Sequence, residues 1–196
     1  MFYTQYSKPF LDTFIAIIGI VVLSPVLLLI SIINYYTYKK VFFVQERSGL
    51  NMKPFKFVKF QTMKDQTFIG VSDINRTTRF GKMLRTTSMD ELPQLFLVIT
   101  RTMSLIGPRP LLLDYNSHYT VEQRSRFTVK PGITGWAQVN GRNKTTWEER
   151  FQFDVFYVKN ISFRMDMLIL VKTFFQLTKF SEVNASENQT MKHFNK

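Results

Sequence analysis

Two adjacent carboxylates, Asp90 and Glu91, stand in the stretch SMDELPQL of an otherwise strongly basic chain. An ionised carboxylate can attack an electrophile without help from a general base. Ser88 and Glu91 also have capping-box spacing, so the same residues could simply start a helix. Pro93 disfavours Ser88 as the N-cap, because a proline at the fifth helical position lacks a needed donor. With Asp90 as the N-cap, Pro93 falls in the first turn and the helix start keeps Asp90 ionised. Local sequence leaves both capping and catalysis open.

Three basic residues have side chains suited to phosphate, namely Lys59, Arg85 and Arg109. Arg109 lies between two prolines in GPRP, and an arginine on a stiff backbone loses less entropy when it binds a phosphate. A structural ion pair is an equal alternative for any one of them. The chain has no P-loop, HExxH, Gly-x-Ser-x-Gly or Asp-x-Asp pattern, so the common kinase, hydrolase and metalloprotease classes are poorly supported.

The composition limits the possible partners and metals. Lys and Arg total 26 against 14 Asp and Glu, a formal charge of +12 that attracts nucleic acid, anionic lipid or phosphorylated substrates. The 196 residues are 45% hydrophobic, enough for one domain with a sizeable core. The chain has no cysteine and two histidines, so any metal must be a hard ion held by oxygen ligands.

Residues 14–33 form an uncharged stretch of twenty residues, which is long enough for a membrane segment. Ser24 and Pro25 lie near its centre, where the proline removes a backbone donor and predicts a break. Lys8 precedes the segment, and Lys39 and Lys40 follow it. Basic flanks favour the cytoplasmic side, so lysines at both ends favour a re-entrant helix-break-helix over a simple crossing, which remains the alternative.

The elements that must position the carboxylates follow this segment. The pattern predicts a strand pair over residues 41–47 and 54–62, a surface loop over 64–79 and the start of a helix over 80–85. Further predictions are a helix over 111–126, a long loop over 131–143, a capped helix over 146–159, an apolar helix over 162–177 and a polar tail over 181–196. Three parts result, residues 1–40, 41–180 and 181–196.

Several motifs occur in order along nearly the whole chain. After the Ser24-Pro25 break come KFQTM, LRTTSMDELPQL, MSLIGPRPLL, PGITGWAQVNGRN and WEERFQFDVFYVKNISFRMD. With them the chain resembles the small monotopic phosphoglycosyl transferases of the bacterial sugar transferase family. The resemblance implies a mostly helical α+β fold, with a re-entrant membrane helix and a compact cytoplasmic domain that contains a small β-hairpin and interfacial helices. It places the protein at the bacterial inner membrane.

The resemblance also implies a reaction. Asp90 attacks the β-phosphate of a UDP-sugar and releases UMP, and undecaprenyl phosphate then takes the sugar phosphate from the carboxylate. Glu91 completes an Asp-Glu dyad, and Mg²⁺ is expected at Asp90, because an anionic nucleophile approaching a diphosphate needs its charge repulsion cancelled. Nucleic acid is not an expected partner. By analogy the substrate-binding candidates are Lys59, Arg85 and Arg109, and, more weakly, Gln138, Asn140 and Arg142.

Some positions depart from the family pattern. Arg101 and Thr102 stand where the family usually has Gly-Asp, Gln61 stands where Arg or Lys is usual, and Leu97 replaces a frequent Asn. The sequence does not identify the sugar, although the tail resembles those of members that use N-acetylated or diamino sugars. Two other readings stay open: a non-catalytic basic module that binds anionic lipid or nucleic acid, and a bitopic protein with an outward-facing domain.

Overall fold

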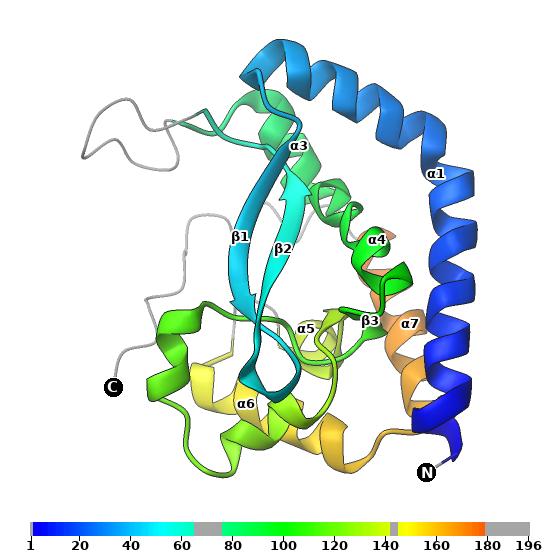
Figure 1. The fold of residues 1–196 in the computed structure, drawn as a ribbon, viewed down its shortest axis with the longest axis vertical. Coiled ribbons are helices and arrows are strands. Elements are labelled where there is room, and N and C mark those ends of the chain that lie inside the picture. Colours follow the sequence, from blue (N-terminus) through cyan, green and yellow to red (C-terminus); the bar gives the residue numbers. More distant parts are fainter. Residues whose placement is uncertain (1, 65–75, 142–144, 179–196) are drawn as a thin grey trace.

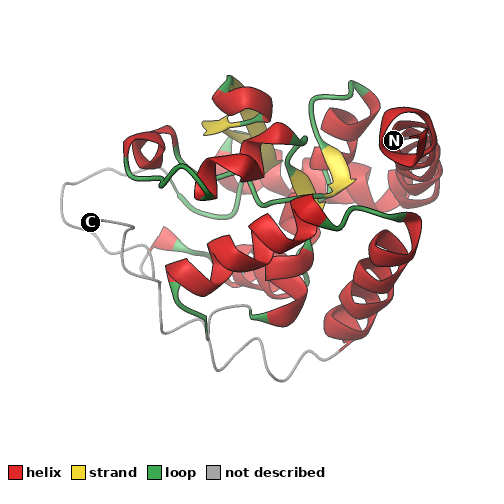
Figure 2. Cartoon of the chain, turned by 90° about the horizontal axis from the view of Figure 1, so that it is seen from below, coloured by secondary structure: helices red, strands yellow, loops and turns green. Residues whose placement is uncertain are grey.

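The computed structural model describes residues 2–64, 76–141 and 145–178 (Figure 1). Helices make up most of the described chain, with two small strand pairs among them (Figure 2). The α-helices are α1 (Lys8–Tyr38), α3 (Arg79–Thr86), α4 (Gln94–Ile99), α5 (Trp136–Asn140), α6 (Trp147–Lys159) and α7 (Phe163–Thr178). The strands are β1 (Phe42–Ser48), β2 (Pro54–Phe60), β3 (Ser104–Ile106) and β4 (Gly132–Thr134). Short π or 3-10 segments are η1 (Tyr3–Ser7), η2 (Leu50–Met52), η3 (Met89–Glu91), η4 (Leu113–Ser117) and η5 (Gln123–Thr128).

Helix α1 is long and apolar enough to cross a membrane, and many of its large apolar side chains are exposed. Pro25 lies inside it, and the helix changes direction partway along (Figure 1). Proline cannot donate to the carbonyl of Val21, and the Ser24 hydroxyl donates to that oxygen instead, at 2.8 Å. The predicted break is therefore a bend within one continuous helix.

Strands β1 and β2 form the predicted antiparallel hairpin. Gln45 lies opposite Phe57, and Phe43 lies opposite Lys59. Directly opposed residues project from the same face of a sheet, so Lys59 shares one face with Phe57 and with alternate residues of β1. The hairpin thereby presents Lys59 toward η3, which packs against β2 and α3.

A second, parallel strand pair, β3 with β4, lies in the main core. Its strands approach so closely that a Cβ on Gly132 would lie 2.0 Å from the Gly107 nitrogen, which requires glycine there. Helix α7 packs against α5 and both of these strands, and α1 packs mainly against α4. The core comprises Ala16, Phe57, Val98, Met103, Leu105, Ile106, Val139, Tyr157 and Ile169.

Helix α3 and the two C-terminal helices confirm their predictions, and α6 has the expected capping box at Thr146 and Glu149. Two other predictions are wrong. Residues 111–126 do not form one helix, because Thr120 and Gln123 exchange side-chain to backbone hydrogen bonds that start the separate segment η5. Residues 131–141 are not an irregular loop, because they contain β4 and α5. Most of 64–79 and the whole of 181–196 lie outside the described residues.

Candidate active site

Glu91 is the hub of a charged cluster formed by η3, β2 and the GPRP segment. Its Oε1 accepts hydrogen bonds from Lys59 Nζ and Arg109 Nη2, each at 2.6 Å, and Oε2 accepts a longer one of 3.4 Å from Arg109 Nη1. Burial alone would raise the pKa of Glu91, but Arg109 and Lys59 outweigh it and hold that pKa at about 2. Glu91 is therefore ionised and occupied by two cations.

Asp90 has a different environment from its neighbour. It is 6% exposed, and its Oδ2 lies 3.6 Å from Lys59 Nζ. Across the described residues, its carboxylate accepts no hydrogen bond. Burial raises the pKa of Asp90, and the attraction of Lys59, Arg109 and Arg85 only partly opposes that rise. Asp90 is thus a buried carboxylate with open acceptor sites.

The predicted N-cap role of Asp90 is wrong. Asp90 lies inside the 3-10 turn η3, and α4 begins four residues later at Gln94, with Pro93 in the N-cap position. This turn is built from i to i+3 hydrogen bonds, such as Leu92 N to Met89 O, and Pro93 has no N–H to continue them. The local environment therefore raises the pKa of Asp90, whereas a helix N-terminus would have lowered it.

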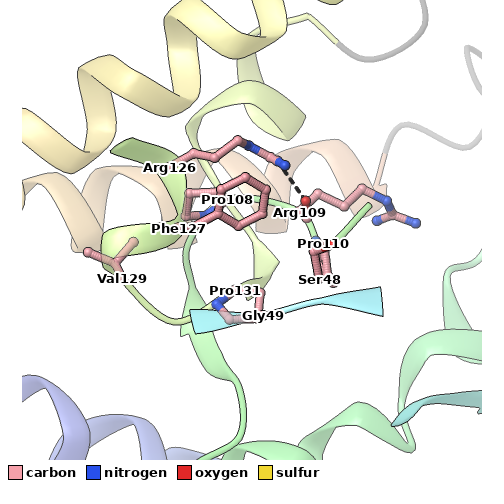
Figure 3. Close-up of a pocket in the computed structure, with 9 residues that line it drawn as sticks. All are labelled: Ser48, Gly49, Pro108, Arg109, Pro110, Arg126, Phe127, Val129 and Pro131. Carbon is pink, nitrogen blue, oxygen red and sulfur yellow. Dashed lines mark hydrogen bonds between the residues drawn. The ribbon is translucent and has the colours of Figure 1, made fainter. Parts of the chain in front are cut away.

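Arg109 has a backbone fixed by more than its flanking prolines. Its carbonyl accepts a 2.7 Å hydrogen bond from Arg126 Nη2, and the Arg109 side chain extends away from Arg126 (Figure 3). Arg126 is 3% exposed and pairs with the buried Asp154 through Nε at 3.0 Å and Nη2 at 2.8 Å. Sequence reasoning missed Arg126 and Asp154. The available signal was a single carboxylate in the apolar run FQFDVFYV, which indicates a buried ion pair.

Arg85 completes the group of cations that the structure brings together near the carboxylates. Its Nε donates to Thr62 Oγ1 at 2.9 Å, and its charge acts on Asp90. Lys59, Arg85 and Arg109 thus reach Asp90 and Glu91 from three separate elements: β2, α3 and the loop after β3. This arrangement holds three cations against two carboxylates, and it suits a ligand with several negative charges.

The weaker candidates of the sequence lie elsewhere. Asn140 is exposed on α5, where its Nδ2 donates to Trp136 O and its Oδ1 accepts from Lys172 Nζ. The Gln138 amide is buried and has no hydrogen-bond partner in the described ranges. Among those residues, no hydrogen bond links either side chain to Asp90 or Glu91. Arg142 lies outside the described residues.

The described part of the chain contains no cluster of three or more acidic or histidine side chains that could hold a metal ion by themselves. Mg²⁺ commonly binds one or two carboxylates together with substrate phosphates and water. Asp90 fits that requirement because its acceptors are open, whereas those of Glu91 are occupied by Lys59 and Arg109.

Two of the atypical residues serve the fold. Gln61 is buried at the end of β2, and its Nε2 donates to Met63 O at 2.6 Å. Arg101 has φ 59° just after α4, where the N–H of Thr102 binds Leu97 O and its own N–H binds Val98 O. These bonds form a Schellman motif, whose left-handed residue is usually glycine. Glycine is therefore favoured at position 101 by the left-handed backbone conformation and not by a role in the reaction.

The chain is similar to known proteins over most of its length. Residues 3–180 match the family model described as bacterial sugar transferase. The chain is 43% identical over 172 residues to the uncharacterized sugar transferase EpsL of Bacillus subtilis, covering 86% of this chain and 85% of that protein. It is 38% identical over 186 residues to the UDP-glucose:undecaprenyl-phosphate glucose-1-phosphate transferase of Xanthomonas campestris, covering 87% of this chain but 38% of that longer protein. It is 34% identical to the exopolysaccharide production protein ExoY of Sinorhizobium fredii, covering 85% and 83% of the two chains. The chain therefore belongs to the bacterial sugar transferase family.

Proposed function

We propose that this protein transfers a sugar 1-phosphate from a UDP-sugar to a polyprenol phosphate, such as undecaprenyl phosphate, and that it starts the assembly of a lipid-linked glycan. The observation that carries the proposal is Asp90: a buried carboxylate without a hydrogen-bond donor among the described residues, beside cations held by its neighbour Glu91. The relatives named as UDP-glucose:undecaprenyl-phosphate transferases support the same substrate classes.

The reaction proceeds in two displacements at phosphorus. An Asp90 oxygen attacks the β-phosphorus of the UDP-sugar, the bond from that phosphorus to the bridging oxygen breaks, and UMP leaves with the electron pair. A phosphate oxygen of the polyprenol phosphate then attacks the same phosphorus. The bond to Asp90 breaks, the carboxylate is regenerated, and the polyprenol diphosphate sugar is the product. Since Asp90 is the nucleophile, no base is needed to activate it.

The cations around Glu91 lower the electrostatic barrier to this attack. Lys59 lies within 3.6 Å of Asp90, and it and Arg109 are held in place by Glu91, so they meet the diphosphate without reorganising. A magnesium ion at Asp90 and the substrate phosphates would supply further neutralisation of the diphosphate charge. Glu91 acts in this scheme as an anchor for cations, not as a second nucleophile.

Helix α1 supports an active site at the membrane surface, where a polyprenol phosphate presents its head group. Its exposed apolar side chains and its bend at Pro25 fit a re-entrant helix with both ends on the cytoplasmic side of the bacterial inner membrane. Cysteine labelling from one side of the membrane at the exposed Tyr6, before α1, and at Lys40, after it, tests this topology. Labelling of only one of the two positions would show a crossing helix.

The catalytic proposal is tested with the full chain purified in detergent, a panel of UDP-sugars, Mg²⁺ and detection of UMP. The wild type should release UMP, and without the lipid acceptor its mass should increase by one sugar phosphate. Asp90→Asn should abolish both signals because a carboxamide is a poor nucleophile. Asp114→Asn, at an exposed carboxylate of η4, is the matched control and should keep them. Normal turnover by Asp90→Asn would refute the nucleophile, and binding of anionic lipid without any turnover would support a non-catalytic module.

A further inference from the structure

We propose that Arg47, which sequence reasoning did not single out, binds the α-phosphate of the nucleotide sugar and so retains the UMP leaving group. The inference rests on the proposed function and extends it to a further residue of the same site. It depends on the position of Arg47 in the hairpin, on the absence of an ion-pair partner for its side chain among the described residues, and on the charges near it.

The hairpin places Arg47 on the same face as Lys59. Arg47 lies opposite Phe55 in the register, so it projects from the face that also carries Phe57 and Lys59. The Arg47 guanidinium carbon and Lys59 Nζ each lie 5.6 Å from the centre of the Phe57 ring. One aromatic ring therefore supports two cations, and Lys59 already reaches Glu91 and Asp90.

The Arg47 side chain is half-buried but has few partners of its own. Its Nη2 donates to Gln45 Oε1 at 2.7 Å. Its Nε is buried without a hydrogen-bond partner, and no carboxylate lies within ion-pair distance of Arg47 in the described ranges. Desolvating a guanidinium that has no ion-pair partner is costly, so a bound anion would make the arrangement more favourable.

The neighbouring charges indicate where that anion lies. Burial, and next the repulsion from Arg109, lower the pKa of Arg47. Along the shared face of the hairpin, the pair Gln45 and Phe57 lies between Lys59 and Arg47, and Arg47 is nearer the hairpin loop. Lys59 is the residue that lies beside Asp90, so Arg47 lies farther along that face. If the β-phosphorus is at Asp90, Arg47 is placed to bind the phosphate next along the diphosphate.

The end of β1 is also fixed to the segment that carries Arg109. The Ser48 N–H donates to Leu111 O at 3.0 Å, and the Ser48 hydroxyl donates to Asn116 Oδ1 at 2.7 Å. Ser48 is 1% exposed, so this junction is buried and rigid. Arg47 and Arg109 are thus held near each other before substrate binds, which lowers the entropic cost of binding a shared anion.

The direct experiment measures UMP binding to the purified full chain by calorimetry. Arg47→Gln should weaken UMP binding by about 10- to 100-fold, the range for a lost charge-assisted hydrogen bond. Arg47→Lys keeps the positive charge but loses the two parallel donors of the guanidinium, so it should weaken binding by several-fold. This variant also tests the inference if Arg47→Gln does not fold. Lys56→Gln, at an exposed cation on β2, is the matched control and should bind UMP as the wild type does.

Kinetics separates the possible outcomes. With Arg47→Gln, kcat/KM for the UDP-sugar should fall while KM for the polyprenol phosphate stays constant. Wild-type UMP affinity in both Arg47 variants would overturn the inference, as would a raised KM confined to the polyprenol phosphate. Neither result would contradict the proposal that Asp90 is the nucleophile. If the wild type itself released no UMP from any UDP-sugar, the proposed function would fail instead.

Discussion

Two charged clusters lie inside this protein, and they differ in how completely their groups are paired. In one, Asp166 of α7 accepts hydrogen bonds from Tyr3, Lys8 and Tyr157, at 2.6, 2.8 and 2.8 Å, and so ties the start of α1 to α6 and α7. Asp12 of α1 accepts from Ser104 in the same region. Every one of these side chains has a partner, so the cluster is closed.

The cluster around Glu91 is open by comparison. Glu91 itself is paired, but Asp90 accepts no hydrogen bond and Arg47 has no carboxylate partner among the described residues. Both clusters are buried and both join distant segments, so burial of charge does not by itself distinguish them. Open hydrogen-bond sites do, because a buried polar group with such sites can still form favourable hydrogen bonds with a ligand.

The largest expected effect comes from breaking the closed cluster. Asp166→Asn should lower the free energy of unfolding by about 3–5 kcal/mol, because it leaves Lys8 buried without its closest counter-charge. Asp90→Asn removes a buried charge that accepts no hydrogen bond, so it should leave the stability unchanged or raise it. Thermal unfolding of both variants in detergent measures the contrast, and equal destabilisation by the two substitutions would remove the distinction between the clusters.

The next effect is on the pH dependence of activity and of stability. Since the pKa of Asp90 is raised above the ordinary aspartate value of 3.8, kcat/KM should fall on acidification at a higher pH than an ordinary aspartate would give. Stability has the opposite pH dependence. Folding takes up a proton at Asp90 between its unfolded-state and folded-state pKa values. The stabilisation from this proton is therefore present at low pH and is lost as pH rises through the folded-state pKa. The stability gain of Asp90→Asn over the wild type should therefore be absent below the unfolded-state pKa, grow between the two pKa values and be complete above the folded-state pKa. A pH series of initial rates and of unfolding temperatures checks both signs.

The smallest expected effect concerns a residue that belongs to neither cluster. Arg101→Gly should raise the free energy of unfolding by about 0.5–1 kcal/mol, because glycine adopts the left-handed conformation at φ 59° without steric cost. Denaturant unfolding compares the two proteins, with UMP release as the control for function. A loss of stability would mean that the Arg101 side chain contributes more than its backbone conformation costs.

Local patterns predicted those parts of the fold in which the relevant physics is local. The hairpin followed from two apolar runs around a short loop, and α6 followed from the spacing of Thr146 and Glu149. Such patterns failed where two local signals compete. Asp90 had the sequence of an N-cap, yet the i to i+3 turn before Pro93 placed it in a buried 3-10 segment instead.

The candidate site shows the same division. Asp90, Glu91, Lys59, Arg85 and Arg109 could be selected from the sequence because their types suit a diphosphate and because the ordered motifs resemble one family. Arg126 and Arg47 could not be selected, because their roles depend on partners far along the chain: the Arg109 carbonyl for the first, and the Phe57 ring and the Arg109 charge for the second.

The sequence by itself determined the family, the apolar segment with its central proline and the residue types available for phosphate chemistry, because these depend on composition and order. Only the tertiary structure decided which carboxylate accepts hydrogen bonds from the cations and which keeps its acceptor sites open. Asp90 and Glu91 are adjacent in the chain, but Lys59 of the hairpin and Arg109 of the GPRP loop both bind Glu91. Asp90 lies buried beside these two cations. Charge pairing depends on distance in space, and the fold alone sets that distance.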